Sequence, residues 1–278
     1  MSLLGRLFGS KPQALMRDVA ALASPHAVPA VQVRLDDVPS RSHVGGRPNL
    51  PQGADWPTRN GVRLDFLARL SLAEIHDAAQ MDWLPAIGAL LFFYDLERQP
   101  WGYDPADRGS WAVLLVHDLE GAATAADPLP NAGPRIPFRY AHFRPIQSLP
   151  SWERKSIESL GLSDAESEEL MRLADQAFGD KPKHQIGGFP VPVQGDDMEL
   201  EAQLVSHGVY CGTESGYKDP RAAVLRPGAA EWKLLFQFDS DDDLGLMWGD
   251  AGTLYFWVRE VPAREGKFQD TWLVLQCS

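Results

Sequence analysis

The sequence contains few cysteines: Cys211 and Cys277 are the only two among 278 residues. They lie far apart and have no Cys-x-x-Cys spacing, so they predict neither a structural zinc site nor a disulfide framework. Such a low cysteine content is typical of proteins in a reducing compartment. We therefore expect the protein to be cytoplasmic.

Long apolar runs are also missing. No stretch approaches the ~20 consecutive apolar residues that a membrane-spanning helix needs. The apolar start of the chain, residues 3–8, is interrupted by Arg6 and is too short for the core of a signal peptide. Contact of residues 3–8 with a membrane surface is a weaker alternative to a frayed or docked terminus. We therefore expect no stable membrane insertion.

Motifs of the common enzyme classes are absent as well. The chain has no Gly-x-Ser-x-Gly nucleophile elbow, no His-Glu-x-x-His metal motif, no P-loop and no dinucleotide fingerprint. His207 and Cys211 are four residues apart, but their Gly- and Ser-rich surroundings favour an ordinary buried cysteine over a thiol and base pair. We identify no catalytic residue, lean against an enzyme, and expect no cofactor.

The negative charge is unevenly distributed along the chain. Residues 1–150 hold 14 Lys and Arg against 15 Asp and Glu, whereas residues 151–278 hold 12 against 23, so nearly all of the net charge of −12 belongs to the second half. An acidic surface repels nucleic-acid phosphates and attracts basic partners. We therefore expect no nucleic-acid binding and a possible basic protein partner; the simpler alternative is that the charge serves solubility.

The hydrophobic pattern predicts an α+β fold with a mostly antiparallel sheet and peripheral helices. Alternating or continuous apolar segments predict strands, and segments with helical spacing predict helices. The predicted strands are 31–38, 62–70, 88–96, 110–119, 233–239, 252–260 and 271–277, and the predicted helices are 12–24, 71–80, 151–161 and 163–180. Ser71 with Glu74, and Ser163 with Glu166, predict capping boxes at two helix starts. Asn60-Gly61 predicts a tight hairpin turn.

Two parts of the chain resemble each other. Gly45-Gly46-Arg47-Pro48 matches Gly187-Gly188-Phe189-Pro190, and residues 66–70 and 88–93 match residues 234–238 and 252–257. The order of loop, strand and Gly-led aromatic strand is the same in both parts, and the second part carries an insertion around residues 206–222. We interpret this as an internal duplication. The expected division is an N-terminal helical segment (1–30), a first half-repeat (31–120), a connector with a helical hairpin (121–182) and a second half-repeat (183–278). Residues 31–278 are expected to form one compact domain.

Four segments resemble the YwqG-like family of bacterial proteins of unknown function. They are GGRPNLPQGADWP (45–57), LDFLARLSL (64–72), GGFPVPVQGD (187–196) and LLFQFDSDDDLGLMWGDAGTLYFWV (234–258), and the resemblance spans about residues 43–278. It implies an α+β fold of two similar halves, no established activity or cofactor, and, for some members, a role that looks like immunity toward secreted toxins. The family pattern has Gln where this chain has Arg69, so a polar role shared by this position and Gln237 is in doubt.

The acidic segment DSDDDLGLMWGD offers a weak metal candidate. Asp239, Asp241, Asp243 and Asp250 have the spacing of an EF-hand calcium loop. However, Leu244 stands where that loop needs Gly, the last ligand is Asp instead of Glu, and strands are predicted where helices should flank the loop. We therefore favour the interpretation as a solvated acidic turn over the interpretation as a calcium site.

The remaining candidates concern binding. Trp248 and Asp250 flank Gly249 and could form a recognition corner, although a structural turn is the simpler interpretation. His43 and His184 precede the two Gly-Gly pairs and would face each other if the two loops met. Trp101, Tyr103 and Trp111 in the loop at 99–111 could line a groove or belong to the core.

We expect an uncharacterised, non-catalytic protein-binding module whose acidic half engages a basic surface, and an immunity-like role toward a basic toxin is one form of this expectation. Asp239, Asp241, Asp242 and Asp243 would supply the charge and Trp248 a contact anchor. The alternative is a hydrolase or small-ligand-binding protein with a site between the two halves, near His43, His184, Gln237 and Asp250.

Overall fold

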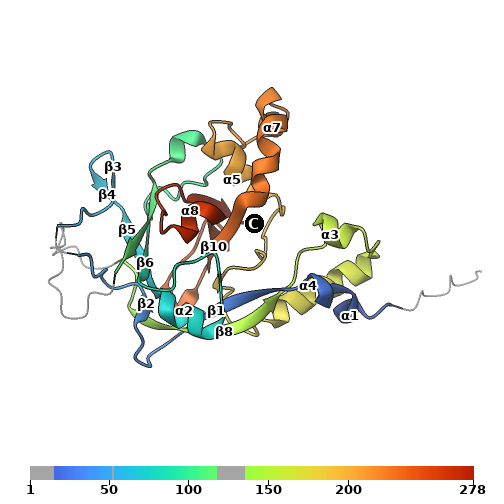
Figure 1. Cartoon of the computed structure of the whole chain (residues 1–278), viewed down its shortest axis with the longest axis horizontal. Helices are drawn as coiled ribbons and strands as arrows, with labels where there is room; N and C mark the ends of the chain where they lie inside the picture. The colour runs from blue at the N-terminus through green and yellow to red at the C-terminus, as the bar shows by residue number, and fades with distance from the viewer. Residues whose placement is uncertain (1–15, 52, 118–134) are drawn as a thin grey trace, which may run out of the picture.

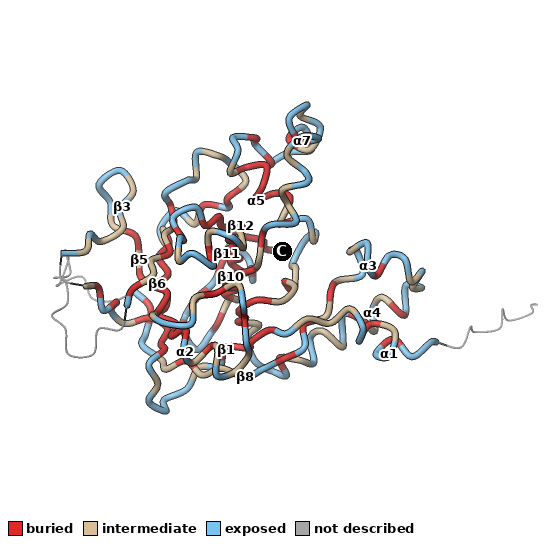
Figure 2. The backbone as a smooth tube through the Cα atoms, viewed as in Figure 1, coloured by how far each residue is buried: buried red, intermediate tan, exposed pale blue. Residues whose placement is uncertain are grey.

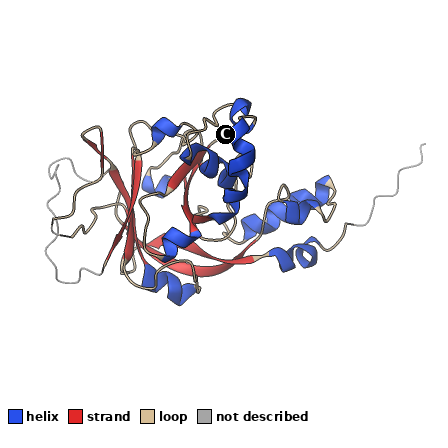
Figure 3. Cartoon of the chain, turned by 45° about the horizontal axis from the view of Figure 1, so that its top comes forward, coloured by secondary structure: helices blue, strands red, loops and turns tan. Residues whose placement is uncertain are grey.

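A computed structural model describes residues 16–51, 53–117 and 135–278, and these residues build one ten-stranded sheet. All neighbouring strands of this sheet are antiparallel, in the order β12-β11-β10-β9-β1-β8-β2-β5-β6-β7. The sheet is strongly curved and forms a nearly closed, barrel-like structure (Figure 3). With its helices, this architecture confirms the predicted α+β class and the mostly antiparallel sheet.

Seven strands of the sheet follow predicted apolar segments of the sequence, whereas three strands, 42–44, 139–148 and 185–186, were not predicted. The ten strands are β1 (Val28–Asp36), β2 (Ser42–Val44), β5 (Asp65–Ser71), β6 (Ala89–Tyr94), β7 (Trp111–Val116), β8 (Arg139–Ser148), β9 (Gln185–Ile186), β10 (Trp232–Asp239), β11 (Thr253–Arg259) and β12 (Trp272–Gln276). A separate hairpin joins β3 (Thr58–Arg59) and β4 (Val62–Arg63) through the predicted Asn60-Gly61 turn, whose two residues have φ of 52° and 78°.

The centre of the sheet is the long pair β1 and β8, which is in register from Val28 opposite Ser148 to Asp36 opposite Tyr140. On one side of this pair the order is β2-β5-β6-β7, and on the other it is β9-β10-β11-β12. Each series begins with a short strand, β2 or β9. The strand beside it, β5 in one series and β10 in the other, carries a bulge. The two series therefore place their strands and irregularities in the same order.

The Gly-Gly pairs lie directly after β2 and β9, and all four glycines have φ between 64° and 73°. Residues with a side chain rarely adopt this left-handed region of φ. The surroundings of these glycines also leave no space for a Cβ atom. A Cβ at Gly45 would collide with the backbone carbonyl of Pro137, and one at Gly188 would come within 2.6 Å of the Cβ of Ser148. Both turns therefore require glycine, and each is closed against strand β8 or the segment before it.

The main core fills the concave side of the curved sheet, where the two series of strands face each other. The ring of Phe92 in β6 lies 4.9 Å from that of Phe236 in β10 and 5.2 Å from that of Phe256 in β11. All three side chains are fully buried, and buried residues concentrate along these strands (Figure 2). Burial of large aromatic groups from both series provides the main apolar contribution to stability.

Helices cover the sheet and extend it at one end (Figure 1). They are α1 (Val19–Ala23), α2 (Leu72–Ala78), α3 (Lys155–Glu158), α4 (Asp164–Gln176), α5 (Met198–Ser206), α6 (Glu214–Tyr217), α7 (Pro220–Leu225) and α8 (Glu260–Arg264). Helices α1 and α4 share a small separate core at the far end of β1 and β8. Helix α5 packs on β10 and β12. None of the described helices has the length and apolar character required to cross a membrane.

Of the two predicted capping boxes, one is confirmed and one is wrong. At the start of α4, the Ser163 side chain accepts a hydrogen bond from the Glu166 amide and the Glu166 side chain accepts one from the Ser163 amide. At the start of α2, Ser71 makes no side-chain cap. Glu74 instead accepts hydrogen bonds from the hydroxyls of Ser40 and Ser42, because the chain before β2 lies beside this helix.

Other predictions of local structure differ in their extent. The predicted helix 12–24 corresponds to α1, which begins only at Val19; residues 12–15 lie outside the described part of the chain. The predicted helix 151–161 is reduced to the short α3. The segment 121–182, which we interpreted as a connector, contains the central strand β8, and its residues 121–134 are not among those described.

Candidate functional site

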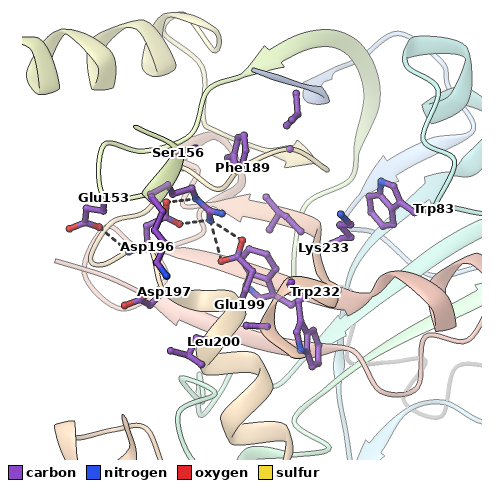
Figure 4. Close-up of a pocket in the computed structure, with 18 of the residues that line it drawn as sticks. Trp83, Glu153, Ser156, Phe189, Asp196, Asp197, Glu199, Leu200, Trp232 and Lys233 are labelled. Carbon is purple, nitrogen blue, oxygen red and sulfur yellow. Dashed lines mark hydrogen bonds and ion pairs between the residues drawn. The ribbon is translucent and has the colours of Figure 1, made fainter. Parts of the chain in front are cut away.

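A pocket of about 920 Å³ lies where the central strands meet α3 and α5 (Figure 4). Its lining comes from segments far apart in sequence: the start of β1, the loop after α2, the region of α3, the second Gly-Gly loop, the N-terminal turn of α5, and β10 with the 3₁₀ helix before it (Arg226–Glu231). Residues that converge from so many elements are typical of a ligand-binding cleft.

Arg154 is the central charged group of this pocket. It is the N-cap residue of α3, and its guanidinium reaches across to the segment that enters α5. Nε and Nη2 each donate to one carboxylate oxygen of Asp196, both over 2.6 Å, and Nη2 also lies 2.9 Å from Glu199 Oε1. The guanidinium lies 4.8 Å from the centre of the Phe189 ring. Two carboxylates and one aromatic ring therefore fix this side chain.

The charges of this cluster do not balance. The Asp196 side chain has no exposed surface, whereas Glu199 retains 20% exposure. Burial lowers the pKa of Arg154, but the hydrogen bonds and charges of Asp196 and Glu199 raise it by more. The net pKa is above its normal value, so the guanidinium stays charged. Burial raises the pKa of Glu199, and the charge of Arg154 offsets this only in part. One guanidinium is thus shared by two carboxylates, and negative charge is left at the pocket surface.

The opposite wall of the pocket is aromatic and contains one lysine. Figure 4 shows Trp83 and Lys233 on the side away from Asp196 and Glu199. The Lys233 ammonium lies 3.3 Å from a carboxylate oxygen of Glu260, so it is already paired. Buried Trp232, whose indole N–H donates to Gln203, completes this wall. The arrangement offers a partly buried carboxylate facing an aromatic surface, which suits a positively charged organic group.

The structure places the sequence-predicted residues His184 and Asp241 in direct contact. His184 Nδ1 accepts the backbone N–H of Asp239, so Nε2 carries the proton and donates to Asp241 Oδ2 over 3.1 Å. Both side chains are buried. Burial raises the pKa of Asp241, but the hydrogen bond from His184 and those from the amides of Asp243 and Leu244 outweigh burial, so the pKa lies below its normal value. The pair ties the acidic turn to the strand β9.

The rest of the acidic segment forms a tight turn between β10 and β11. The Asp241 side chain caps a single 3₁₀ turn, the Leu244 side chain is buried, and Gly245 is left-handed with φ of 63°. The Asp239 carboxylate accepts from the Thr253 hydroxyl and from the Lys183 amide. Asp242, Asp243 and Asp250 are exposed. Within the described ranges, no three His, Cys, Asp or Glu side chains converge in a way that could hold a metal ion.

Gln237 and Trp248 are buried. The Gln237 amide donates to the Lys183 carbonyl and accepts from the Val191 amide, so it holds both ends of the second Gly-Gly loop. Trp248 is fully enclosed and packs against Tyr94 and Phe238. Its indole anchors the acidic turn to the core. Neither side chain lines the pocket of Arg154.

His43 is not close to His184. It lies in β2, and its ring lies between Phe66 and Phe138 at centroid distances of 5.6 and 5.0 Å. Strands β1 and β8 separate β2 from β9, so the two histidines are about three strand spacings, or ~14 Å, apart. Burial lowers the pKa of His43 to about 4, so this ring is neutral near pH 7. The two Gly-Gly loops therefore do not bring the histidines together.

Sequence reasoning did not find Arg154, Asp196 or Glu199. A signal was nevertheless present: in MELEAQLVS, residues 198–206, Glu199 and Glu201 alternate with apolar residues, so a helix that buries its apolar residues must bring at least one carboxylate inside. In α5, Glu201 is buried and Glu199 is intermediate. The partner Arg154 could not be predicted, because 42 residues separate it from Asp196.

The fold and the cleft thus define a curved α+β domain with an internal acidic pocket. The sequence model of one family, described as a domain of unknown function (DUF1963), matches residues 42–277. The chain belongs to this family. The match confirms the expectation of an uncharacterised family over nearly the same range as the resemblance noted in the sequence, whereas the YwqG-like name stays a prediction. No curated protein matches the chain.

Proposed function

We propose that this protein is a non-catalytic binding module that takes a positively charged side chain of a basic protein partner into the pocket of Arg154. The observation that carries the proposal is the cluster of Arg154, Asp196 and Glu199, in which one partly buried guanidinium serves two carboxylates. A lysine or arginine side chain beside Glu199 would supply the missing positive charge. Charge-assisted hydrogen bonds of this kind are about twice as strong as neutral ones.

The distribution of charge supports a basic partner. The half of the chain from residue 151 on carries nearly all of the excess negative charge, and it supplies most of the pocket lining. A field of this sign accelerates the approach of a basic protein and disfavours nucleic acid. An immunity-like role, in which the partner is a basic toxin, is one specific form of this proposal. The two free, buried cysteines are compatible with the proposed cytoplasmic location.

We also infer that the two strand series arose by duplication. The inference is supported by the equal strand order on both sides of β1 and β8, by the bulge in β5 and in β10, and by the left-handed Gly-Gly pair after β2 and after β9. The proposed binding pocket lies on one side only. Most of the segment that contains α5, α6 and α7 has no counterpart in the first series. This segment gives the second series a pocket wall that the first series lacks.

The hydrolase alternative has less support in the geometry. A general base needs a free nitrogen within hydrogen-bond reach of its substrate. Both ring nitrogens of His184 are engaged inside the protein, by the Asp239 amide and the Asp241 carboxylate. His43 is enclosed by two aromatic rings and its Nδ1 lies 3.0 Å from the Gly45 carbonyl oxygen. Binding without catalysis is therefore the function that we propose.

The test is titration calorimetry with hexa-arginine and hexa-lysine peptides, with hexa-glutamine as the uncharged control, at low and moderate salt. We expect the basic peptides to bind and Glu199→Gln to weaken binding about tenfold, because a charge-assisted hydrogen bond is lost. The matched control is Asp242→Asn with Asp243→Asn, which removes exposed charge from the acidic turn. Equal binding by Glu199→Gln, or a larger loss in the control variant, would contradict the proposed site.

A further inference from the structure

We propose a second binding site on the other face of α5: the pocket around Glu201 takes a small organic ammonium or guanidinium compound that donates an N–H to the Glu201 carboxylate. This pocket has a volume of about 670 Å³. It is lined by α5, by α6 with the segment before it, and by the loop between β6 and β7. Its size lies within the range of small-molecule sites.

The first observation is a carboxylate oxygen without a partner. Glu201 is only 7% exposed, and its Oε1 accepts a hydrogen bond from the Tyr217 hydroxyl over 2.7 Å. Its Oε2 is fully buried and makes no hydrogen bond of ordinary length within the described residues, although the Tyr103 hydroxyl also faces this carboxylate. A buried polar atom of this kind carries the full cost of its lost hydration. A ligand N–H at this oxygen would remove that cost.

The second observation is an aromatic lining. Tyr103 and Tyr217 are partly buried beside Glu201, while Trp101 and Tyr210 are 44% and 48% exposed at the pocket. Aromatic faces attract organic cations within about 6 Å of the ring centre. Large exposed aromatic side chains that share one pocket are more informative than scattered ones, because a common ligand accounts for all of them.

The charges around this pocket favour a cation over an anion. Glu201, Asp104 and Asp107 line it, with Arg98 as the one basic residue among its lining. The Cys211 thiol also lines the pocket, and burial raises its pKa to about 12, so it carries no charge near pH 7. The requirement for an N–H donor at Oε2 distinguishes the expected ligand from a quaternary ammonium, which could use only the aromatic rings.

The test uses ligand-observed NMR with n-butylamine and agmatine as probes, 1-butanol as the uncharged control, and tetramethylammonium as the cation without an N–H. We expect the amine or the guanidine to bind, and the alcohol and tetramethylammonium to bind at least about tenfold more weakly, because each loses a charge-assisted hydrogen bond. Failure of both probes to bind, or equal binding by tetramethylammonium, would overturn the proposal.

Two variants test the named residues. Glu201→Gln should lower probe affinity about tenfold, and Trp101→Ala several-fold through loss of one aromatic wall. The Trp101 side chain is 44% exposed, and its residue bonds Leu275 through the backbone carbonyl, which alanine retains; this variant therefore tests the pocket if Glu201→Gln is unstable. Asp242→Asn with Asp243→Asn removes exposed charge outside both pockets, so it is the control and should leave probe binding unchanged. Because Glu199→Gln tests the peptide site and Glu201→Gln this one, the two proposals fail separately.

Discussion

His43 and Gln185 make the same hydrogen bond in the two Gly-Gly turns. His43 Nδ1 lies 3.0 Å from the carbonyl oxygen of Gly45, and Gln185 Nε2 donates to the carbonyl oxygen of Gly187 over 2.6 Å. Each residue pairs across the ladder with a bulged strand, His43 with Arg69 in β5 and Gln185 with Gln237 in β10. The structural counterpart of His43 is therefore Gln185 and not the neighbouring His184.

This relationship predicts that His43→Gln makes the protein less sensitive to acid. Burial lowers the pKa of His43 to about 4 from an unfolded value of 6.5. The unfolded chain thus binds more protons than the folded one, and stability is lost as pH falls from 6.5 toward 4. Glutamine keeps the donor for Gly45 but does not titrate, so the variant should avoid a loss of up to roughly 3 kcal/mol.

The measurement is urea unfolding of wild type and His43→Gln at pH 7 and pH 4.5. Exposed His117→Gln serves as the control. An equal fall in the free energy of unfolding for all three proteins would show that His43 does not carry this acid sensitivity.

Glu201 predicts the opposite pH dependence. Burial raises the pKa of Glu201 to about 7, partly offset by the Tyr217 hydrogen bond and increased again by the charges of Asp197 and Glu199. The folded protein then binds more protons than the unfolded chain above the unfolded pKa of 4.5, so Glu201 lowers stability as pH rises toward 7. Glu201→Gln should therefore stabilise the protein more at pH 8 than at pH 5, by roughly 3 kcal/mol at most.

Denaturant melts of Glu201→Gln and wild type at these two pH values measure this difference. The same stability change at pH 5 and pH 8 would be inconsistent with a buried Glu201 carboxylate. Tyr103, Cys211 and Tyr217 also face this group. Burial raises the pKa of the Cys211 thiol to about 12 and those of the two tyrosines above their normal value, so they do not titrate in this interval.

Removal of Arg154 should be strongly destabilising. Arg154→Met keeps most of the apolar side chain but leaves the fully buried Asp196 carboxylate without its cation. Breaking a buried pair on one side costs about 3–5 kcal/mol. Arg172→Met is the control, because Arg172 pairs with Glu169 at an exposed site, where the expected loss is below about 1 kcal/mol. Chemical unfolding measures both, and equal losses would argue against a structural role for the Arg154 cluster.

Gly102→Ala should be much more harmful than Gly109→Ala. Both glycines are left-handed, with φ of 81° and 88°. A Cβ at Gly102 would collide with the backbone carbonyl of Leu273, whereas one at Gly109 meets nothing within 4 Å. Gly109→Ala should cost about 1–2 kcal/mol from backbone strain alone. Gly102→Ala should at least double that loss in thermal unfolding, and similar losses would mean that the loop does not rest on β12.

The fold could be predicted from the sequence where residue spacing alone determines structure. The segments that became β5, β6, β7, β10, β11 and β12 have apolar runs long enough to identify strands. Strand β8 was missed because its burial pattern is irregular and Pro145 lies within it, although it is a central strand. Its place depends on the nine paired residues of β1 and not on its own composition.

The candidate sites were less predictable than the fold. Glu74 forms hydrogen bonds with Ser40 and Ser42 rather than with a helix cap, and Asp196 is paired with Arg154, because the tertiary structure brings distant segments together. Local sequence rules favoured the acidic turn at 239–243, where charge is concentrated. In the structure, part of that charge is used internally by His184 and by backbone amides.

The loop that carries Trp101 and Gly102 has a further consequence for the outermost strand β12. The Leu275 amide donates to the Trp101 carbonyl over 3.0 Å, and the Trp272 indole donates to the Gly102 carbonyl over 2.8 Å. An uncovered outer strand offers its backbone to other chains and so promotes intermolecular β-pairing. The loop occupies part of that backbone. Displacing it should therefore cause aggregation of folded molecules at concentrations where the intact protein stays monodisperse.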